Sequence, residues 1–226
     1  MPVTGRFELH IFVGPLAPDE ETIARFRAAC AAADPPMKPL LLALDYVGRG
    51  FVPVLQSSRY VEGDEATARA AAARDAAILR DAGLAVLREK VEAMADAQGV
   101  PNDAADVAAQ TEEERAAHYF EFHLLVDKAD GSGLSETDML GLREVAERYS
   151  LALHTPVPLS YNVLKPGQRF LNLRARRIGL SDAEHTVAAL ERAITVDGTL
   201  AIKKRIAEYI CFDSNRALDN GWLEPA

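Results

Sequence analysis

The pattern Glu-x-His occurs twice in this chain, each time inside an apolar stretch with strand-like alternation. It appears as Glu8 and His10 in RFELHIFV, and again as Glu121 and His123 in HYFEFHLLV. Residues i and i+2 of a strand point to the same side, so each pair presents a carboxylate and an imidazole together. An imidazole can transfer protons near neutral pH. These four residues are therefore the candidate catalytic residues.

Basic side chains accompany both pairs on later strands, and they are the candidate ligand-binding residues: Arg88, Lys90, Arg174, Arg176, Lys203 and Arg205. Guanidinium and ammonium groups bind phosphate or carboxylate oxygens. Carboxylates can also hold Mg²⁺ or Mn²⁺, which bridge to phosphates. We therefore expect a small anionic, phosphate-containing ligand to bind in a polar cleft between the two halves of the chain. Hydrolysis or transfer of that ligand is a further step that the sequence does not decide.

Two other interpretations of the same residues stay open. In the first, the polar strand faces are solvated and carry cross-strand ion pairs, Glu8 with Arg88 or Lys90 and Glu121 with Lys203 or Arg205. Such pairs contribute about 0.2–1 kcal/mol each, and the protein would be a non-catalytic interaction or scaffold module. In the second, the two Glu-x-His pairs together form a divalent metal site, because carboxylates and imidazoles suit zinc or a similar ion. The sequence leaves open whether the protein is an enzyme.

Three blocks of the first half recur in the same order in the second half. Glu8 and His10 recur at an offset of 113 residues, and GLAVLREKVEA aligns with GTLAIKKRIAE at an offset of 115. Between them, VLQSSRYVEGDEATA aligns with FLNLRARRIGLSDAE at an offset of 116. Nearly constant offsets over three blocks indicate a tandem duplication.

Each half is predicted to follow the order strand, helix, strand, strand, helix, strand. In the first half we expect strands at 7–13, 40–47, 52–61 and 84–93, with helices at 18–33 and from Asp64 to Gly83. In the second half we expect strands at 119–127, 169–178 and 199–212. Pro156 and Pro158 interrupt residues 151–163, which are expected to be an edge strand or irregular. Helices should begin at Ser135 and, with a Ser181-x-x-Glu184 capping box, near residue 181. The predicted domains are 1–98, a linker at 99–117 with a short helix, and 118–226.

This βαββαβ order is the ferredoxin-like arrangement, so the predicted fold class is α+β, with antiparallel sheets and helices on one face. Alternation places Phe7, Leu9, Ile11 and Val13 against the helices and Glu8 and His10 on the opposite face. The same reasoning places Ile202 and Ile206 against the helices and Lys203 and Arg205 away from them.

Composition narrows the class of protein. The 226-residue chain has a net charge of −9, which argues against a nucleic-acid partner. It has no apolar run long enough for a membrane helix and no signal-peptide pattern at its start. Two isolated cysteines, Cys30 and Cys211, are typical of a cytoplasmic protein. The abundance of Ala, Arg and Asp is typical of a bacterium with GC-rich DNA. The oligomeric state is not predicted.

Several common catalytic patterns are absent from the sequence. It contains no GxSxG, CxxC or HExxH, and the GRG at Gly48–Gly50 is expected to be a hairpin turn rather than a phosphate loop. The single tryptophan, Trp222, is expected to hold the C-terminal tail against the body of the protein.

The duplicated FExH strands, together with the tail DSNRALDNGWL, resemble an uncharacterised bacterial protein family. That resemblance implies a fold pattern and no activity. In plan alone, the chain is similar to the CYTH-like triphosphate tunnel enzymes, which are built from duplicated α/β units with polar strands. Their ExExK signature would require glutamates and a lysine where this chain has Glu8, His10 and Phe12. The similarity is therefore one of fold plan and does not carry over a triphosphatase site.

Overall fold

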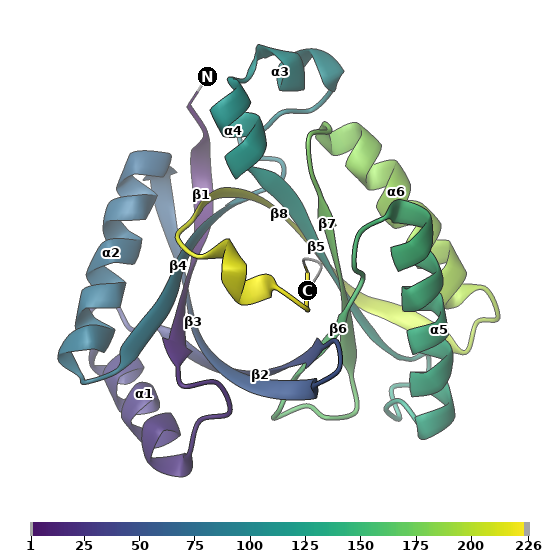
Figure 1. Ribbon diagram of the computed structural model, residues 1–226, viewed down its shortest axis with the longest axis horizontal. Coiled ribbons are helices and arrows are strands. Elements are labelled where there is room, and N and C mark those ends of the chain that lie inside the picture. Colours follow the sequence, from purple (N-terminus) through teal and green to yellow (C-terminus); the bar gives the residue numbers. More distant parts are fainter. Residues whose placement is uncertain (1, 224–226) are drawn as a thin grey trace. The chain divides into compact units, whose positions relative to one another are not determined.

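The computed structural model describes residues 2–223, and the order strand, helix, strand, strand, helix, strand occurs in it twice (Figure 1). The first series consists of β1 (Thr4–Gly14), α1 (Glu20–Ala32), β2 (Lys38–Tyr46), β3 (Gly50–Asp64), α2 (Glu65–Asp81) and β4 (Ala85–Met94). The second consists of β5 (Tyr119–Lys128), α5 (Glu136–Leu153), β6 (Leu159–Asn162), β7 (Arg169–Ala175), α6 (Leu180–Thr195) and β8 (Leu200–Asp213). The predicted α+β class is confirmed.

Three short helices complete the described chain. The predicted linker contains two of them, α3 (Ala104–Ala109) and α4 (Glu112–Ala117), and a 3₁₀ turn at Arg216–Asp219 follows β8. Among residues 2–223, no helix combines the length and apolar character that crossing a membrane requires.

The chain divides into two compact units that do not follow chain order throughout. The first unit comprises residues 1–42, 52–100 and 208–218, and the second comprises 43–51, 101–207 and 219–226. Residues 43–51 fall within the predicted first domain but belong to the second unit. Residues 208–218 fall within the predicted second domain but belong to the first unit.

In the first unit the strands lie in the order β4–β1–β3–β2, and β1 pairs antiparallel with both β3 and β4. The C-terminal part of β8 pairs antiparallel with β4. Helices α1 and α2 lie side by side, and α2 packs on β1 and β4. Four residues of β1 were predicted to face the helices, and each is at most 1% exposed: Phe7, Leu9, Ile11 and Val13. These helices therefore cover the apolar face of β1, and the Glu-x-His pair lies on the opposite face.

In the second unit the strand order is β8–β5–β7–β6, with β7 antiparallel to both β5 and β6. Helices α5 and α6 pack on each other, and α6 packs on β5. The apolar residues Phe120, Phe122, Leu124 and Val126 of β5 are buried, as the alternation predicts. The second unit therefore has the same strand plan as the first.

Local capping explains most of the helix starts. The predicted N-caps Asp64 and Ser135 are confirmed, since each side chain accepts a hydrogen bond from a backbone N–H three residues later. The predicted Ser181 capping box is wrong, because α6 begins at Leu180 after Gly179 and has no side-chain cap. The N–H groups of Leu180 and Ser181 donate instead to the carbonyl oxygens of Pro101 and Asn102. Backbone acceptors from a distant segment thus replace the side-chain cap.

The segment 151–163, expected to be an edge strand or irregular, is divided into the end of a helix, an irregular stretch and a short strand. Helix α5 continues to Leu153, and β6 covers only Leu159–Asn162. His154 ends the helix in the left-handed conformation, at φ 51°, and Pro156 and Pro158 follow it. Because proline lacks an N–H group, the strand forms only beyond the second proline.

Candidate functional site

Polar side chains of the first unit gather on the sheet face opposite its helices. We call Glu8, His10, Lys90, Glu92 and Glu208 the first polar cluster. In the strand register Glu8 lies opposite Glu92, and His10 lies opposite Lys90. Glu208 of β8 lies opposite Met94, two residues beyond Glu92 on the same side of β4. Three strands therefore bring these five side chains together.

The His10 imidazole has a fixed orientation. Its Nδ1 lies 3.0 Å from the carbonyl oxygen of Ser57, which can only accept, so Nδ1 carries a hydrogen and donates. The other ring nitrogen, Nε2, lies 3.4 Å from Glu92 Oε2 and 3.7 Å from Glu8 Oε1. Burial opposes a charge on His10, but the Glu92, Glu8 and Glu208 carboxyl groups outweigh it and raise its pKa to about 9. Without a metal ion, His10 is a cation at neutral pH.

The three carboxyl groups of this cluster share few positive charges. Lys90 Nζ lies 2.6 Å from Glu92 Oε1. Burial raises the pKa of Glu92, but Lys90 and His10 outweigh it and hold that pKa well below its usual range. Glu92 also shares a hydrogen bond with Glu208.

The side chains around the Glu8 end of the cluster reach solvent. Glu8 is 12% exposed and accepts hydrogen bonds from the hydroxyl groups of Ser58 and Tyr60. Tyr60 is 44% exposed. The exposed Arg6 guanidinium lies 4.0 Å from the centre of the Tyr60 ring. The cluster is therefore accessible beside Glu8, where an exposed cation also lies.

The solvated face expected from the sequence is not found among the described residues of the first unit. His10, Lys90 and Glu92 are each at most 7% exposed. Arg88 does not pair with Glu8 but forms a buried two-pronged ion pair with Asp213, at 2.5 and 2.8 Å. The reason is position: Arg88 lies opposite Phe12, two residues along β1 from His10, near the end of β8.

A second polar cluster occupies the corresponding face of the second unit and consists of Glu121, His123, Asn172, Arg174 and Asp219. Arg174 donates to Glu121 at 2.6 and 3.1 Å and to Asp219 at 2.6 Å. The expected partners of Glu121, Lys203 or Arg205, are replaced by Arg174, which lies directly opposite in the register. Burial lowers the pKa of Arg174, but Glu121, Tyr119 and Asp219 outweigh it and raise that pKa. The guanidinium is thus held between two carboxylates.

His123 is held in the same way as His10. Asn172 uses its NH₂ group to donate to Pro158 O and Ser160 Oγ, each at 3.0 Å, which directs its Oδ1 toward the imidazole. His123 Nδ1 therefore donates to Oδ1 at 2.7 Å, and Nε2 lies 3.8 Å from Glu121 Oε2. In both Glu-x-His pairs Nδ1 donates a hydrogen bond and Nε2 faces the glutamate two residues earlier, with different charges around them.

The other predicted ligand-binding residues, Arg176, Lys203 and Arg205, make contacts with groups outside the two clusters. The Arg176 guanidinium lies over the Tyr119 ring at 4.4 Å, and Lys203 Nζ donates to Ala129 O at 3.0 Å. The predicted orientation of Arg205 is wrong, because it pairs with Glu184 and Glu191 of α6 and therefore faces the helices. The physical cause is that alternation fixes which residues share a face but not which face is packed.

Three functional residues were missed in the sequence: Glu208, Asp213 and Asp219. Arg205 faces the helices, and Glu208 lies three positions further along the same strand. Because residues an odd number of positions apart point to opposite faces, Glu208 lies on the polar face. Val91 pairs with Phe212 while Glu92 pairs with Ile210, so Cys211 is an extra residue on β8. This bulge lets Asp213 reach the face that Glu208 also occupies. The tail motif DSNRALDNGWL contained Asp213 and Asp219, but its turn-forming composition did not indicate their buried partners.

Two of the four residues expected to form a metal site, Glu8 and His10, join Glu208 in a three-residue group in the first unit. One ligand atom each from Glu8, His10 and Glu208 lies within 4.8 Å of the other two. Metal–oxygen and metal–nitrogen distances are about 2.0–2.4 Å, so ligands on opposite sides of one ion are at most about 4.8 Å apart. These residues can therefore converge on one ion. The predicted shared cleft stays a prediction.

Comparisons with known proteins do not assign the chain to a family. No protein-family model matches it, and no curated protein sequence matches it. A candidate monooxygenase from Fusobacterium nucleatum is 14% identical with a TM-score of 0.37, covering 100% of this chain and 99% of its own. The chlorite dismutase from Candidatus Nitrospira defluvii, in complex with imidazole, is 10% identical with a TM-score of 0.31, covering 92% and 91%. A candidate monooxygenase from Lactobacillus acidophilus is 13% identical with a TM-score of 0.29, covering 92% and 93%.

Proposed function

We propose that the protein binds a divalent metal ion through Glu8, His10 and Glu208 and, through that ion and Arg6, a small phosphate-containing anion. The observation that carries this proposal is the convergence of three ligand atoms within 4.8 Å. The donor set of two carboxylates and one imidazole suits a first-row ion such as Mn²⁺ or Zn²⁺ better than Mg²⁺, which prefers oxygen alone.

Charge balance supports a cation at this site. Once a metal ion displaces the protons of this cluster, including the proton on His10 Nε2, the cluster contains three carboxylates and the single ammonium group of Lys90. Two negative charges then remain in a buried setting, where unbalanced charge is costly. A divalent cation supplies the matching charge.

The orientation of His10 supports the same proposal. Imidazole ligands of metal ions usually donate their other N–H to a carbonyl or carboxylate, which fixes the tautomer. The hydrogen bond from His10 Nδ1 to the Ser57 carbonyl has this form. It leaves Nε2, the nitrogen that faces Glu8 and Glu92, available as a ligand once its proton is lost.

The anionic part of the proposal depends on the metal ion and Arg6. Arg88 and Lys90 are each engaged with a carboxylate, so neither offers an unbalanced charge to a ligand. Arg6 is exposed and lies beside Tyr60, which bonds to Glu8. A phosphate oxygen bound to the ion would lie on the side that Arg6 can reach, and a guanidinium suits such an oxygen.

The metal proposal is tested by calorimetric titration of EDTA-treated protein with Mn²⁺, Zn²⁺ and Mg²⁺ in turn. We expect one site per chain for Mn²⁺ or Zn²⁺, weakened about tenfold or more by Glu208→Gln. Glu121→Gln is the matched control, because it alters the same motif in the second unit and should change the affinity less than about twofold. Absence of binding, or equal affinity in Glu208→Gln, overturns the proposal.

The anion is tested by thermal denaturation in saturating Mn²⁺ with inorganic phosphate, tripolyphosphate or ATP. A bound ligand raises the melting temperature by mass action. We expect a rise with Mn²⁺ present, a smaller one in Arg6→Gln and none in Glu208→Gln. Released inorganic phosphate, measured in the same samples, separates binding from hydrolysis.

A non-catalytic interaction module is the second candidate. The observation that favours it is the pairing of the buried arginines, Arg88 with Asp213 and Arg174 with Glu121 and Asp219. Paired buried charges can serve the fold alone. Unchanged melting with every ion and anion would favour this alternative.

We further propose that the two series of elements arose by tandem duplication of a ferredoxin-like unit. The repeated element order, the equivalent strand orders and the matched arrangement of His10 and His123 support this origin.

A further inference from the structure

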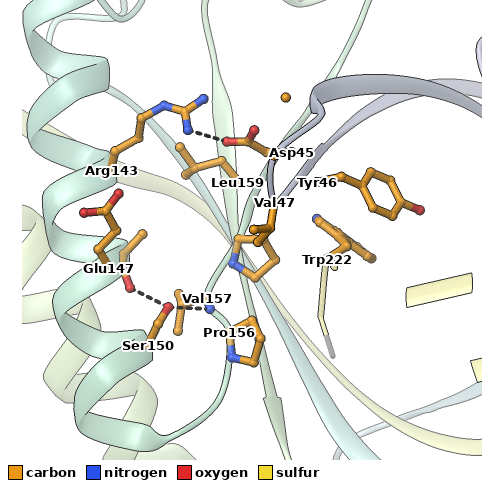
Figure 2. Close-up of a pocket in the computed structure, with 14 residues that line it drawn as sticks. Asp45, Tyr46, Val47, Arg143, Glu147, Ser150, Pro156, Val157, Leu159 and Trp222 are labelled. Carbon is orange, nitrogen blue, oxygen red and sulfur yellow. Dashed lines mark hydrogen bonds and ion pairs between the residues drawn. The ribbon is translucent and has the colours of Figure 1, made fainter. Parts of the chain in front are cut away.

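A pocket of about 410 Å³ lies in the second unit, within the size range of small-molecule sites. Its walls are the end of β2 with the following turn, the middle of α5, residues 156–159 and Trp222 (Figure 2). It contains none of the residues assigned above to metal or anion binding.

Several polar groups at this pocket already have partners within the protein. Arg143 pairs with Asp45 at 2.6 Å, as the dashed line in Figure 2 shows. The Ser150 hydroxyl donates to Ala146 O and accepts from Val157 N, each at 2.8 Å. Val47, 74% exposed, adds an apolar wall together with Val157 and Leu159. The pocket therefore favours a largely apolar occupant.

Trp222 supplies the polar group that lacks a partner. The residue is 7% exposed, and its Nε1–H has no hydrogen-bond acceptor among residues 2–223. In Figure 2 the indole nitrogen lies on the side of the ring that faces Val47. A buried N–H without an acceptor costs about 1–3 kcal/mol. A ligand oxygen that accepts this hydrogen bond would remove that cost, after a small rotation of the indole toward the pocket.

We infer that this pocket binds a small, neutral, mostly apolar molecule whose carbonyl oxygen accepts a hydrogen bond from Trp222. The pocket volume limits the size of the ligand, and the apolar walls favour an apolar body. The unpaired indole N–H favours a ligand with a hydrogen-bond acceptor. The exposed carboxylate of Glu147 on one wall disfavours an anionic ligand.

Trp222 also provides the measurement, because it is the only tryptophan in the chain. The full-length protein is titrated with neutral aromatic amides and ketones such as benzamide, and with benzylamine, which has the same ring without the carbonyl. We expect a saturable change in tryptophan fluorescence and a downfield shift of the single indole N–H resonance with the carbonyl compounds. No saturable change with any of them, or an equal response to benzylamine, overturns the inference.

Two matched variants locate the binding. Val47→Asn changes an exposed pocket wall and should weaken benzamide binding by about fivefold or more. Leu151→Asn is the control, because Leu151 is a similarly exposed apolar side chain, at 77%, that does not line the pocket. This variant should leave benzamide binding unchanged. Equal effects of the two variants overturn the inference. So does a concentration-dependent dimer that Val47→Asn dissociates, since the pocket would then be an interface between copies.

Discussion

At the scale of the residue, one motif occurs in two electrostatic settings. His10 and His123 both donate from Nδ1 and both present Nε2 to the glutamate two residues earlier. In the second unit Arg174 is paired with both Glu121 and Asp219. In the first unit Glu92 and Glu208 add carboxyl groups, and the guanidinium there is committed to Asp213. The neighbours, rather than the motif, therefore make the first cluster the candidate metal site.

The first prediction concerns the proton on His10. In metal-free protein we expect the His10 resonances to titrate with a pKa of about 9 rather than 6.5. Because the folded pKa is raised, the stabilisation is complete below about pH 6.5 and is lost as the pH rises through about 9. Glu92→Gln should lower this pKa, since Glu92 is the strongest of the groups that raise it. Saturating Zn²⁺ should remove the titration, because metal and proton compete for Nε2.

The second prediction concerns the buried ion pair of Arg88. Asp213→Asn leaves a guanidinium that is 1% exposed without its counter-charge, and should lower the free energy of unfolding by about 3–5 kcal/mol in urea denaturation. Glu112→Gln is the control, because the Arg177–Glu112 pair is exposed and should contribute little to the free energy of unfolding. Similar losses in both variants would contradict the assignment of Arg88 and Asp213 as a structural pair.

At the scale of the element, periodicity predicted most strands and helices because one face of each is buried. Its failures have local causes. The bulge at Cys211 changed the phase of β8, and the carbonyl groups of Pro101 and Asn102 replaced the expected cap of α6. Periodicity located Glu8 and His10 on the polar face, but not Glu208 or Asp213. Their positions depend on the register of β8 against β4, which joins residues more than one hundred positions apart and leaves no local pattern.

The third prediction tests the start of α6. A Cβ on Gly179 would lie 2.5 Å from Asn102 O and 2.6 Å from Asp103 Cα, so Gly179→Ala should destabilise the protein by about 1–3 kcal/mol. The backbone there has φ −78°, so the cost is steric rather than conformational. Gly141→Ala, inside α5 with no atom within 4 Å of its new Cβ, should instead stabilise by about 0.5–1 kcal/mol. Thermal denaturation of the two variants checks the opposite signs.

At the scale of the whole molecule, the first unit depends on a segment from the end of the chain. Residues 208–218 belong to that unit, although the sequence suggested a first domain at 1–98. Asp213 neutralises Arg88, the Ser214 N–H donates to Glu89 O, and the Asn215 side chain donates to Leu87 O. Without this segment β4 also loses a neighbouring strand.

The fourth prediction follows from that dependence. A fragment of residues 1–98 should not show a cooperative thermal transition, because Arg88 would be buried without a counter-charge and the edge of β4 would be unpaired. Adding a peptide of residues 200–218 should restore ordered amide resonances, and the same peptide with Asp213→Asn should restore them less. The peptide also supplies Glu208, so Mn²⁺ should stabilise the complex and not the fragment alone. Cooperative melting of the fragment by itself would show that residues 1–98 suffice, and that β8 adds the metal ligand without being needed for the fold.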